Sequence, residues 1–118
     1  MNMKNAAVIS AFGALAHENR LAIYRLLVER GPKGLSAGAI GDRVGLVPSS
    51  LTFHLQNLHR AGLITQQRVS RQLFYSVDFA VMNELVGYLT ENCCRDSEFE
   101  CCVPVQTAKR VKRAAKVA

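Results

Sequence analysis

The sequence predicts a mainly helical domain with a single β-hairpin, in the order helix, helix, helix, helix, hairpin, helix. Apolar residues recur with helical spacing up to residue 62 and again from residue 79, whereas residues 65–77 change to a period of two. A length of 118 residues allows one domain. With 49% hydrophobic and 20% charged residues, the composition is that of a folded globular chain rather than a disordered one.

Two helices are expected before residue 31. Apolar residues at steps of one, three and three predict a helix over residues 6–15 with a broad apolar face. A second helical period covers residues 19–30 and ends at Gly31-Pro32, because glycine can leave the right-handed region and proline cannot continue the helix.

The next two helices form a pair separated by a short turn that contains glycine. Ser36 is a capping residue for a helix over residues 37–44, and Pro48 suits the first turn of a helix over residues 48–60. Two short helices with such a turn are typical of a helix-turn-helix motif. The apolar residues expected to face the core from the second helix are Leu51, Leu55 and Leu58.

A hairpin and a final helix complete the order. Residues 65–69 and 73–77 predict two short strands joined by the polar tip Ser70-Arg71. Helical spacing returns over residues 79–92, with Asp78 as its cap.

The net charge of +6 is concentrated at the carboxyl end. Residues 107–118 carry five basic residues and no acid, which leaves ten basic and nine acidic residues in 1–106. We interpret this segment as a solvated tail, with a nonspecific phosphate-attracting arm as the alternative. The uncharged stretch 5–17 has 13 residues, short of the about 20 that cross a bilayer, and the amino terminus lacks a signal-peptide pattern. The chain is therefore expected to be cytoplasmic.

Four stretches occur in an order that resembles one known family. They are FGALA at 12–16 with ENRLAIY at 18–24, LTFHLQNLHRAGLI at 51–64, the hairpin residues 68–75, and FAVMNEL at 79–85. Over residues 8–94 the chain resembles the ArsR/SmtB family of metalloid- and metal-responsive repressors, the type that controls arsenical resistance operons. The resemblance implies a winged helix-turn-helix fold, mainly α with a β-hairpin wing.

The resemblance also implies a homodimer on double-stranded operator DNA, with one recognition helix of each subunit in successive major grooves. Residues 1–92 would form the DNA-binding and dimerisation domain, 93–106 a cysteine-bearing effector segment, and 107–118 a basic, disordered tail. The first and last helices would meet across the two-fold interface through Val8, Ile9, Phe12, Leu15, Met82, Leu85, Val86 and Leu89.

Polar side chains of the fourth helix and arginines of the hairpin are the expected DNA contacts. The helix residues expected to face base edges or phosphates are Ser49, Ser50, Thr52, His54 and Gln56. Arg68 and Arg71 are expected to reach phosphates or the adjoining minor groove, where they position the protein rather than specify sequence. For His54, packing or phosphate contact is favoured over metal binding, and His17 and His59 are expected to be surface or capping residues.

Two effector sites of the family are missing. Residues 36–42 contain no cysteine, and the last helix contains no histidine. The remaining candidate ligands, in a CC-x₆-CC pattern, are Cys93, Cys94, Cys101 and Cys102. Trivalent arsenic prefers soft thiolates, so we expect arsenite or methylarsenite, and also antimonite, to act as the inducer, with no permanently bound cofactor.

Three alternatives remain open. The cysteines could form a redox-sensing set of disulfides, with Cys93 or Cys94 bonded to Cys101 or Cys102. They could bind another soft cation such as zinc, cadmium or mercury, although their spacing lacks the usual C-x₂₋₄-C of a zinc site. The winged helix could also serve as a protein-interaction module without DNA. No serine-histidine-acid or cysteine-histidine arrangement and no phosphate-binding glycine motif supports an enzyme.

Overall fold

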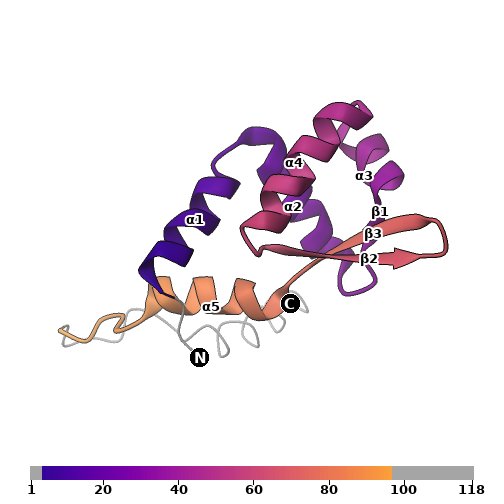
Figure 1. Cartoon of the computed structure of the whole chain (residues 1–118). Helices are drawn as coiled ribbons and strands as arrows, with labels where there is room; N and C mark the ends of the chain where they lie inside the picture. The colour runs from indigo at the N-terminus through magenta and orange to yellow at the C-terminus, as the bar shows by residue number, and fades with distance from the viewer. Residues whose placement is uncertain (1–3, 97–118) are drawn as a thin grey trace, which may run out of the picture.

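The computed structural model describes residues 4–96, and within this range the chain forms five helices and one small antiparallel sheet (Figure 1). The helices are α1 (Asn5–Leu15), α2 (Glu18–Arg30), α3 (Ala37–Val44), α4 (Pro48–Arg60) and α5 (Phe79–Thr90). The strands are β1 (Leu35–Ser36), β2 (Ile64–Val69) and β3 (Gln72–Val77). The predicted winged helix-turn-helix fold, mainly helical with one hairpin between the fourth and fifth helices, is confirmed.

Local sequence signals define the helix-turn-helix formed by α3 and α4. The Ser36 hydroxyl oxygen accepts a hydrogen bond from the backbone N–H of Ala39 at 3.2 Å, which caps α3. Gly45 ends α3 with a φ of 73°, in the left-handed region that glycine adopts without penalty. Pro48 then occupies the first turn of α4, where its missing N–H costs no helical hydrogen bond.

The sheet has the strand order β1-β3-β2, and its two longer strands form the predicted hairpin. Ile64 pairs with Val77, so the hairpin begins and ends beside the core. Strand β1, which pairs Leu35 with Tyr75, was not predicted from the sequence. Gly34 allows this close approach, because a side chain there would collide with the Tyr75 carbonyl.

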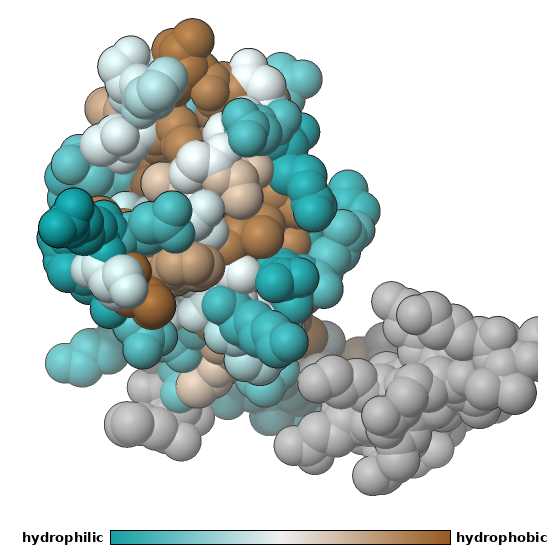
Figure 2. Space-filling model, turned by 90° about the vertical axis from the view of Figure 1, so that its right-hand side faces the viewer, coloured by the Kyte–Doolittle hydropathy of each residue, from teal (hydrophilic) through white to brown (hydrophobic). Residues whose placement is uncertain are grey.

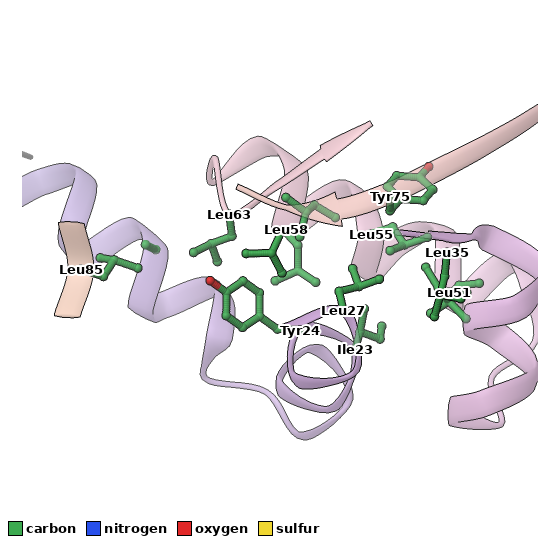
Figure 3. Close-up of a cluster of buried hydrophobic side chains, with 14 of the residues drawn as sticks. Ile23, Tyr24, Leu27, Leu35, Leu51, Leu55, Leu58, Leu63, Tyr75 and Leu85 are labelled. Atoms are coloured by element: carbon green, nitrogen blue, oxygen red, sulfur yellow. The ribbon is translucent and has the colours of Figure 1, made fainter. Parts of the chain in front are cut away.

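One hydrophobic core lies between α2, α4 and the base of the hairpin (Figure 3). The largest fully buried side chains are Ile23, Leu27, Ile40, Leu55, Leu58 and Leu63. As predicted, Leu51, Leu55 and Leu58 face this core. Each buried leucine contributes roughly 1.5–3 kcal/mol relative to an exposed one, so α4 is firmly anchored.

The last helix begins where predicted and ends earlier. The carboxylate of Asp78 caps it by accepting a hydrogen bond from the Val81 N–H at 3.3 Å. Its last residue is Thr90 rather than Asn92, and the backbone of Glu91, with a ψ of 131°, has left the helical region. The Thr90 hydroxyl donates to the Val86 carbonyl at 3.0 Å, which occupies a carbonyl near the helix end.

The apolar faces of α1 and α5 divide into buried and exposed parts. Val8 and Leu85 are only 3% and 4% exposed within one chain. Their assignment to the interface between subunits is therefore wrong, because the subunit's own core already covers them. Ile9 and Leu89 remain 64% and 65% exposed, and Val86 is exposed as well. No helix in residues 4–96 is long and apolar enough to cross a membrane.

Candidate nucleic-acid interface

The outward side of α4 presents a row of side chains opposite the buried leucines. Ser49, Phe53, Gln56 and Arg60 follow one another at steps of four, three and four, which places them on one face of the helix. All four are exposed, and we call them the outer stripe. Ser50 and Thr52, which flank it, are exposed too. The structure thus places four of the five predicted helix residues on the surface.

The wing adds positive charge beside this helix. Arg68 and Arg71 are exposed, at the end of β2 and in the turn of the hairpin. Residues 43–77 contain four arginines and no aspartate or glutamate. The hairpin projects away from the helical body (Figure 1), and the surface on that side carries hydrophilic side chains around a broken central band of apolar ones (Figure 2). A segment with four arginines and no carboxylate suits contact with a polyanion such as DNA.

A groove of about 520 Å³ separates α4 from the sheet. Thr52, Gln56 and Arg60 line it from the helix, and Gln66 and Tyr75 line it from the hairpin. Its rim therefore offers hydroxyl, amide and guanidinium groups, which are the groups that proteins use to bind phosphate oxygens. A nucleic-acid strand that runs between the helix and the wing would meet these groups.

His54 is the exception among the predicted DNA contacts. Its exposed fraction is 6%, and its Nδ1 accepts a hydrogen bond from Arg20 Nε at 3.3 Å. Its ring lies 4.6 Å from the ring of His17, centre to centre. Burial, together with the neighbouring His17 and Arg20, lowers the pKa of His54. The expectation that His54 faces DNA is wrong, because it sits between Leu51 and Leu58 on the inward side; the packing role is confirmed.

Phe53 is the surface residue that the sequence analysis missed. Its side chain is 57% exposed, although it is an aromatic residue on a helix with a good core-facing stripe. The Arg20 guanidinium carbon lies 5.7 Å from the centre of its ring, within the range of a cation–π contact. The helical spacing from Ser49 and to Gln56 is the signal that identifies Phe53 as outward-facing.

The first two cysteines lie in the turns that follow α5. Because the helix ends at Thr90, the adjacent side chains of Cys93 and Cys94 are not forced apart by helical geometry, and their sulfur atoms are 3.4 Å apart. This distance exceeds the length of an S–S bond, about 2.05 Å, so no disulfide bond joins Cys93 to Cys94. Cys93 is exposed, and Cys94 is half-buried and disulfide-bonded.

Part of the predicted effector site lies outside the described residues. Cys101 and Cys102, the rest of the segment 97–106 and the basic tail 107–118 belong to that part. Within residues 4–96, no group of three or more histidine, cysteine or acidic side chains is placed to hold a metal ion. The described sulfurs that could serve a soft ligand are thus those of Cys93 and, after reduction of its disulfide, Cys94.

Comparison with known sequences finds transcriptional regulators. Residues 15–67 match a family described as a helix-turn-helix domain. The chain is 32% identical over 81 residues to the HTH-type transcriptional regulator YgaV of Escherichia coli, which covers 69% of this chain and 80% of that protein. It is 38% identical over 66 residues to the HTH-type transcriptional regulator YceK of Bacillus subtilis, with 56% of this chain and 65% of that protein covered.

Solved structures with the same fold are regulators too. HlyU from Vibrio cholerae has a TM-score of 0.60 at 30% identity, over 75% of this chain and 97% of that one. An ArsR-like transcriptional regulator from a Rhodococcus species has a TM-score of 0.65 at 23% identity, over 96% and 93%. A homodimeric winged helix-turn-helix DNA-binding domain from Mycobacterium bovis has a TM-score of 0.59 at 24% identity, over 80% and 88%.

Proposed function

Since the chain belongs to the HTH-type transcriptional regulators, which are not enzymes, and shares its winged helix fold with ArsR-like regulators, we propose that it is a repressor of the ArsR/SmtB type. It would bind operator DNA as a dimer and be released by trivalent arsenic. The inducer is arsenite or methylarsenite, and antimonite binds in the same way. The proposed ligands are the thiolates of Cys93 and of Cys94, whose disulfide must first be reduced, with Cys101 or Cys102. The observation that carries this proposal is the close approach of two cysteine sulfurs, 3.4 Å apart, directly after α5.

The outer stripe of α4 supports DNA binding at the major groove. Ser49 and Gln56 offer hydrogen-bonding groups that can contact base edges, and a recognition helix of this length fits the groove. Arg68 and Arg71 in the wing supply phosphate contacts that fix the register of the protein on the duplex. In a dimer, the two recognition helices would contact half-sites about one helical turn apart.

Exposed apolar side chains of α1 and α5 support the dimer. Ile9 and Leu89 each leave about two thirds of their surface accessible in the single chain, and Val86 and Tyr88 on α5 are exposed too. Burial of apolar surface stabilises an interface by roughly 25 cal/mol per Å². The Mycobacterium bovis domain of the same fold is homodimeric. A two-fold interface through α1 and α5 would cover these side chains and leave α4 free.

Thiolate chemistry explains the choice of ligand. Trivalent arsenic binds up to three soft sulfur donors in a pyramidal arrangement, whereas structural zinc takes four tetrahedral ligands. Two adjacent sulfurs supply part of such a set, and the six residues between the cysteine pairs are enough for one chain reversal. Because the thiols lose protons when the ligand binds, arsenical affinity should fall as the pH is lowered.

Release from DNA would follow from the position of the cysteines relative to α5. The ligand must favour the arrangement of subunits that does not fit the operator, since a ligand with equal affinity for both states shifts nothing. A ligand that draws the segment after Thr90 together changes the end of a helix that we place in the dimer interface. The typical coupling between two such sites is about 1–3 kcal/mol, or roughly a 5- to 150-fold loss of operator affinity.

The test uses four single variants, in which Cys93, Cys94, Cys101 and Cys102 are each replaced by serine. Operator binding is followed by fluorescence anisotropy during titration with arsenite, methylarsenite and antimonite, under reducing conditions. We expect the variants that lack a ligand cysteine to bind the operator with unchanged affinity and to be released from it no longer by the arsenical. Asp96→Ser, an exposed residue between the pairs, is the matched control and should respond normally. Normal release by all four cysteine variants would falsify the proposal.

A redox response is the second candidate, and one observation favours it. Cys94 is disulfide-bonded in the structure, and one of the solved relatives is a reduced form of HlyU, with 30% identity and a TM-score of 0.55. In this case oxidation and reduction alone would control operator binding. The same anisotropy assay, performed with oxidised glutathione or dithiothreitol and no arsenical, separates the two candidates. Cadmium, mercury and zinc salts in parallel titrations test the other soft cations.

A further inference from the structure

We propose that Phe53 reads the methyl group of a thymine in the major groove, and so makes operator choice depend on thymine at one position of each half-site. This inference rests on the proposed binding of operator DNA by α4. It adds an apolar, base-specific contact to a surface whose other expected contacts are hydrogen bonds and ion pairs.

The side chain of Phe53 points outward from α4. Phe53 lies between Ser49 and Gln56 on the outer stripe, directly opposite the leucines that anchor α4. It is 57% exposed. Burial of an exposed aromatic ring is favourable, because it removes apolar surface from water. Contact with DNA along the outer stripe would bury this ring together with its polar neighbours.

The ring of Phe53 is restrained on one side by Arg20. The Arg20 guanidinium carbon lies 5.7 Å from the ring centre, and Arg20 is itself held by its Nε–H···Nδ1 hydrogen bond to the buried His54. The cation therefore supports Phe53 from the α2 side, while more than half of the residue's surface stays accessible. A restrained ring loses less side-chain entropy on binding than a freely rotating one.

The base edges in the major groove differ in their apolar groups. In the major groove, thymine presents a methyl group, whereas the other characteristic groups of the four bases are hydrogen-bond donors and acceptors. A phenyl ring gains free energy against the methyl group, but against an amino or carbonyl group it removes water without replacing the lost hydrogen bond. Phe53 would therefore favour thymine, and Ser49 and Gln56 beside it can form hydrogen bonds with neighbouring bases.

The experiment removes the methyl group without changing base pairing. An operator is first selected from random DNA with the full-length wild-type protein. Each thymine of a half-site is then replaced singly by deoxyuridine, and the dissociation constants of the wild type, Phe53→Ala and Phe53→Leu are measured. Leu21→Ala, which truncates a 45% exposed apolar side chain on α2, is the matched control. Circular dichroism verifies that each variant is folded.

We expect one deoxyuridine position to weaken wild-type binding about fourfold, the ratio that corresponds to one methyl-sized apolar contact. Phe53→Ala should lose this dependence at that position and respond like the wild type to deoxyuridine at the other positions. Phe53→Leu and Leu21→Ala should retain the dependence. The inference alone fails when the wild type binds a selected operator but Phe53→Ala shows the same ratio of dissociation constants, deoxyuridine over thymine DNA, as the wild type at every position. When the wild type selects no DNA sequence, the proposed function fails and this inference with it.

Discussion

Helices α4 and α5 differ in how much of their apolar surface is buried within their own chain. α4 buries Leu51, Leu55 and Leu58 in the core of its own chain, with exposed fractions of 4% or less. α5 buries only Leu85 to this degree among its described residues, and its Leu89 is 65% exposed. The subunit therefore positions its candidate reading helix alone, whereas α5 keeps apolar side chains exposed, which the proposed dimer would cover.

The proposed DNA-reading surface and the proposed sensing site lie on different parts of the subunit. The cysteines follow α5, and Figure 1 shows α5 at the opposite end of the described structure from the hairpin tip. In the proposed mechanism, a ligand at the cysteines would alter how two subunits pack without distorting the core around α4. Sensing in this arrangement would act on the distance between two intact reading helices rather than on either helix alone.

The largest expected effect contrasts a buried leucine with an exposed one. Leu55→Ala should lower the free energy of unfolding by about 2–5 kcal/mol, because it leaves a cavity in the core beneath α4, and this loss should not depend on protein concentration. Leu89→Ala should destabilise the protein chiefly at low concentration, where the dimer dissociates. Denaturant titrations at several concentrations measure both. Equal concentration dependence of the two variants would contradict the comparison.

A charge on the exposed side of α5 should separate the subunits. Leu89→Asp removes two buried leucines per dimer, at about 1.5 kcal/mol each or more, so the dimer dissociation constant should rise at least a hundredfold. Sedimentation should then show folded monomers with weak operator binding. Asn83→Asp, which adds the same charge at an exposed position of α5, is the control and should stay dimeric. A dimeric Leu89→Asp protein would place the interface elsewhere.

Sequence reasoning succeeded where the signals are local. Ser36, Gly45 and Pro48 define the ends of α3 and α4 through their own backbone and side-chain chemistry, so the observed bounds match the predicted ones. It failed for β1, because a two-residue strand has no periodicity and its pairing of Leu35 with Tyr75 depends on the tertiary fold. The early end of α5 was missed as well, because no glycine or proline marks it.

The candidate site shows a similar division. Polar residues of α4 were expected outside because of their chemistry, and this failed for His54, whose helical position between leucines outweighs its polarity. Phe53 was missed for the converse reason, since an aromatic residue was not considered a surface contact. Which apolar residues of α1 and α5 remain exposed could not be predicted, because burial of Val8 and Leu85 depends on how the helices pack.

A third prediction compares the outer stripe of α4 with the wing. Gln56→Ala should cost about 1–3 kcal/mol on the preferred operator and less on altered sequences, which relaxes specificity. Arg68→Ala should weaken binding to all sequences by a similar factor. It should also reduce the slope of log affinity against log salt concentration by about one. Anisotropy titrations at several salt concentrations on matched and mismatched operators measure both. Arg25→Ala, an exposed arginine on α2, is the control.

The smallest expected effect concerns pH and the support beneath α4. Burial lowers the pKa of His54 in the folded protein, with further contributions from His17 and Arg20, whereas a histidine in the unfolded chain takes up its proton near pH 6.5. Below that pH the unfolded state binds more protons than the folded state, so the free energy of unfolding should decrease as the pH falls.

The decrease should level off once the pH is below the pKa of His54 in the folded protein. Denaturant unfolding between pH 8 and 5 measures it. His54→Gln keeps a polar acceptor for Arg20 but cannot titrate, so its stability should vary less with pH; His59→Gln, an exposed histidine on the same helix, should vary like the wild type. An unchanged pH dependence in His54→Gln would mean that α4 is not stabilised through a neutral His54, and the comparison with α5 would then rest on the leucines alone.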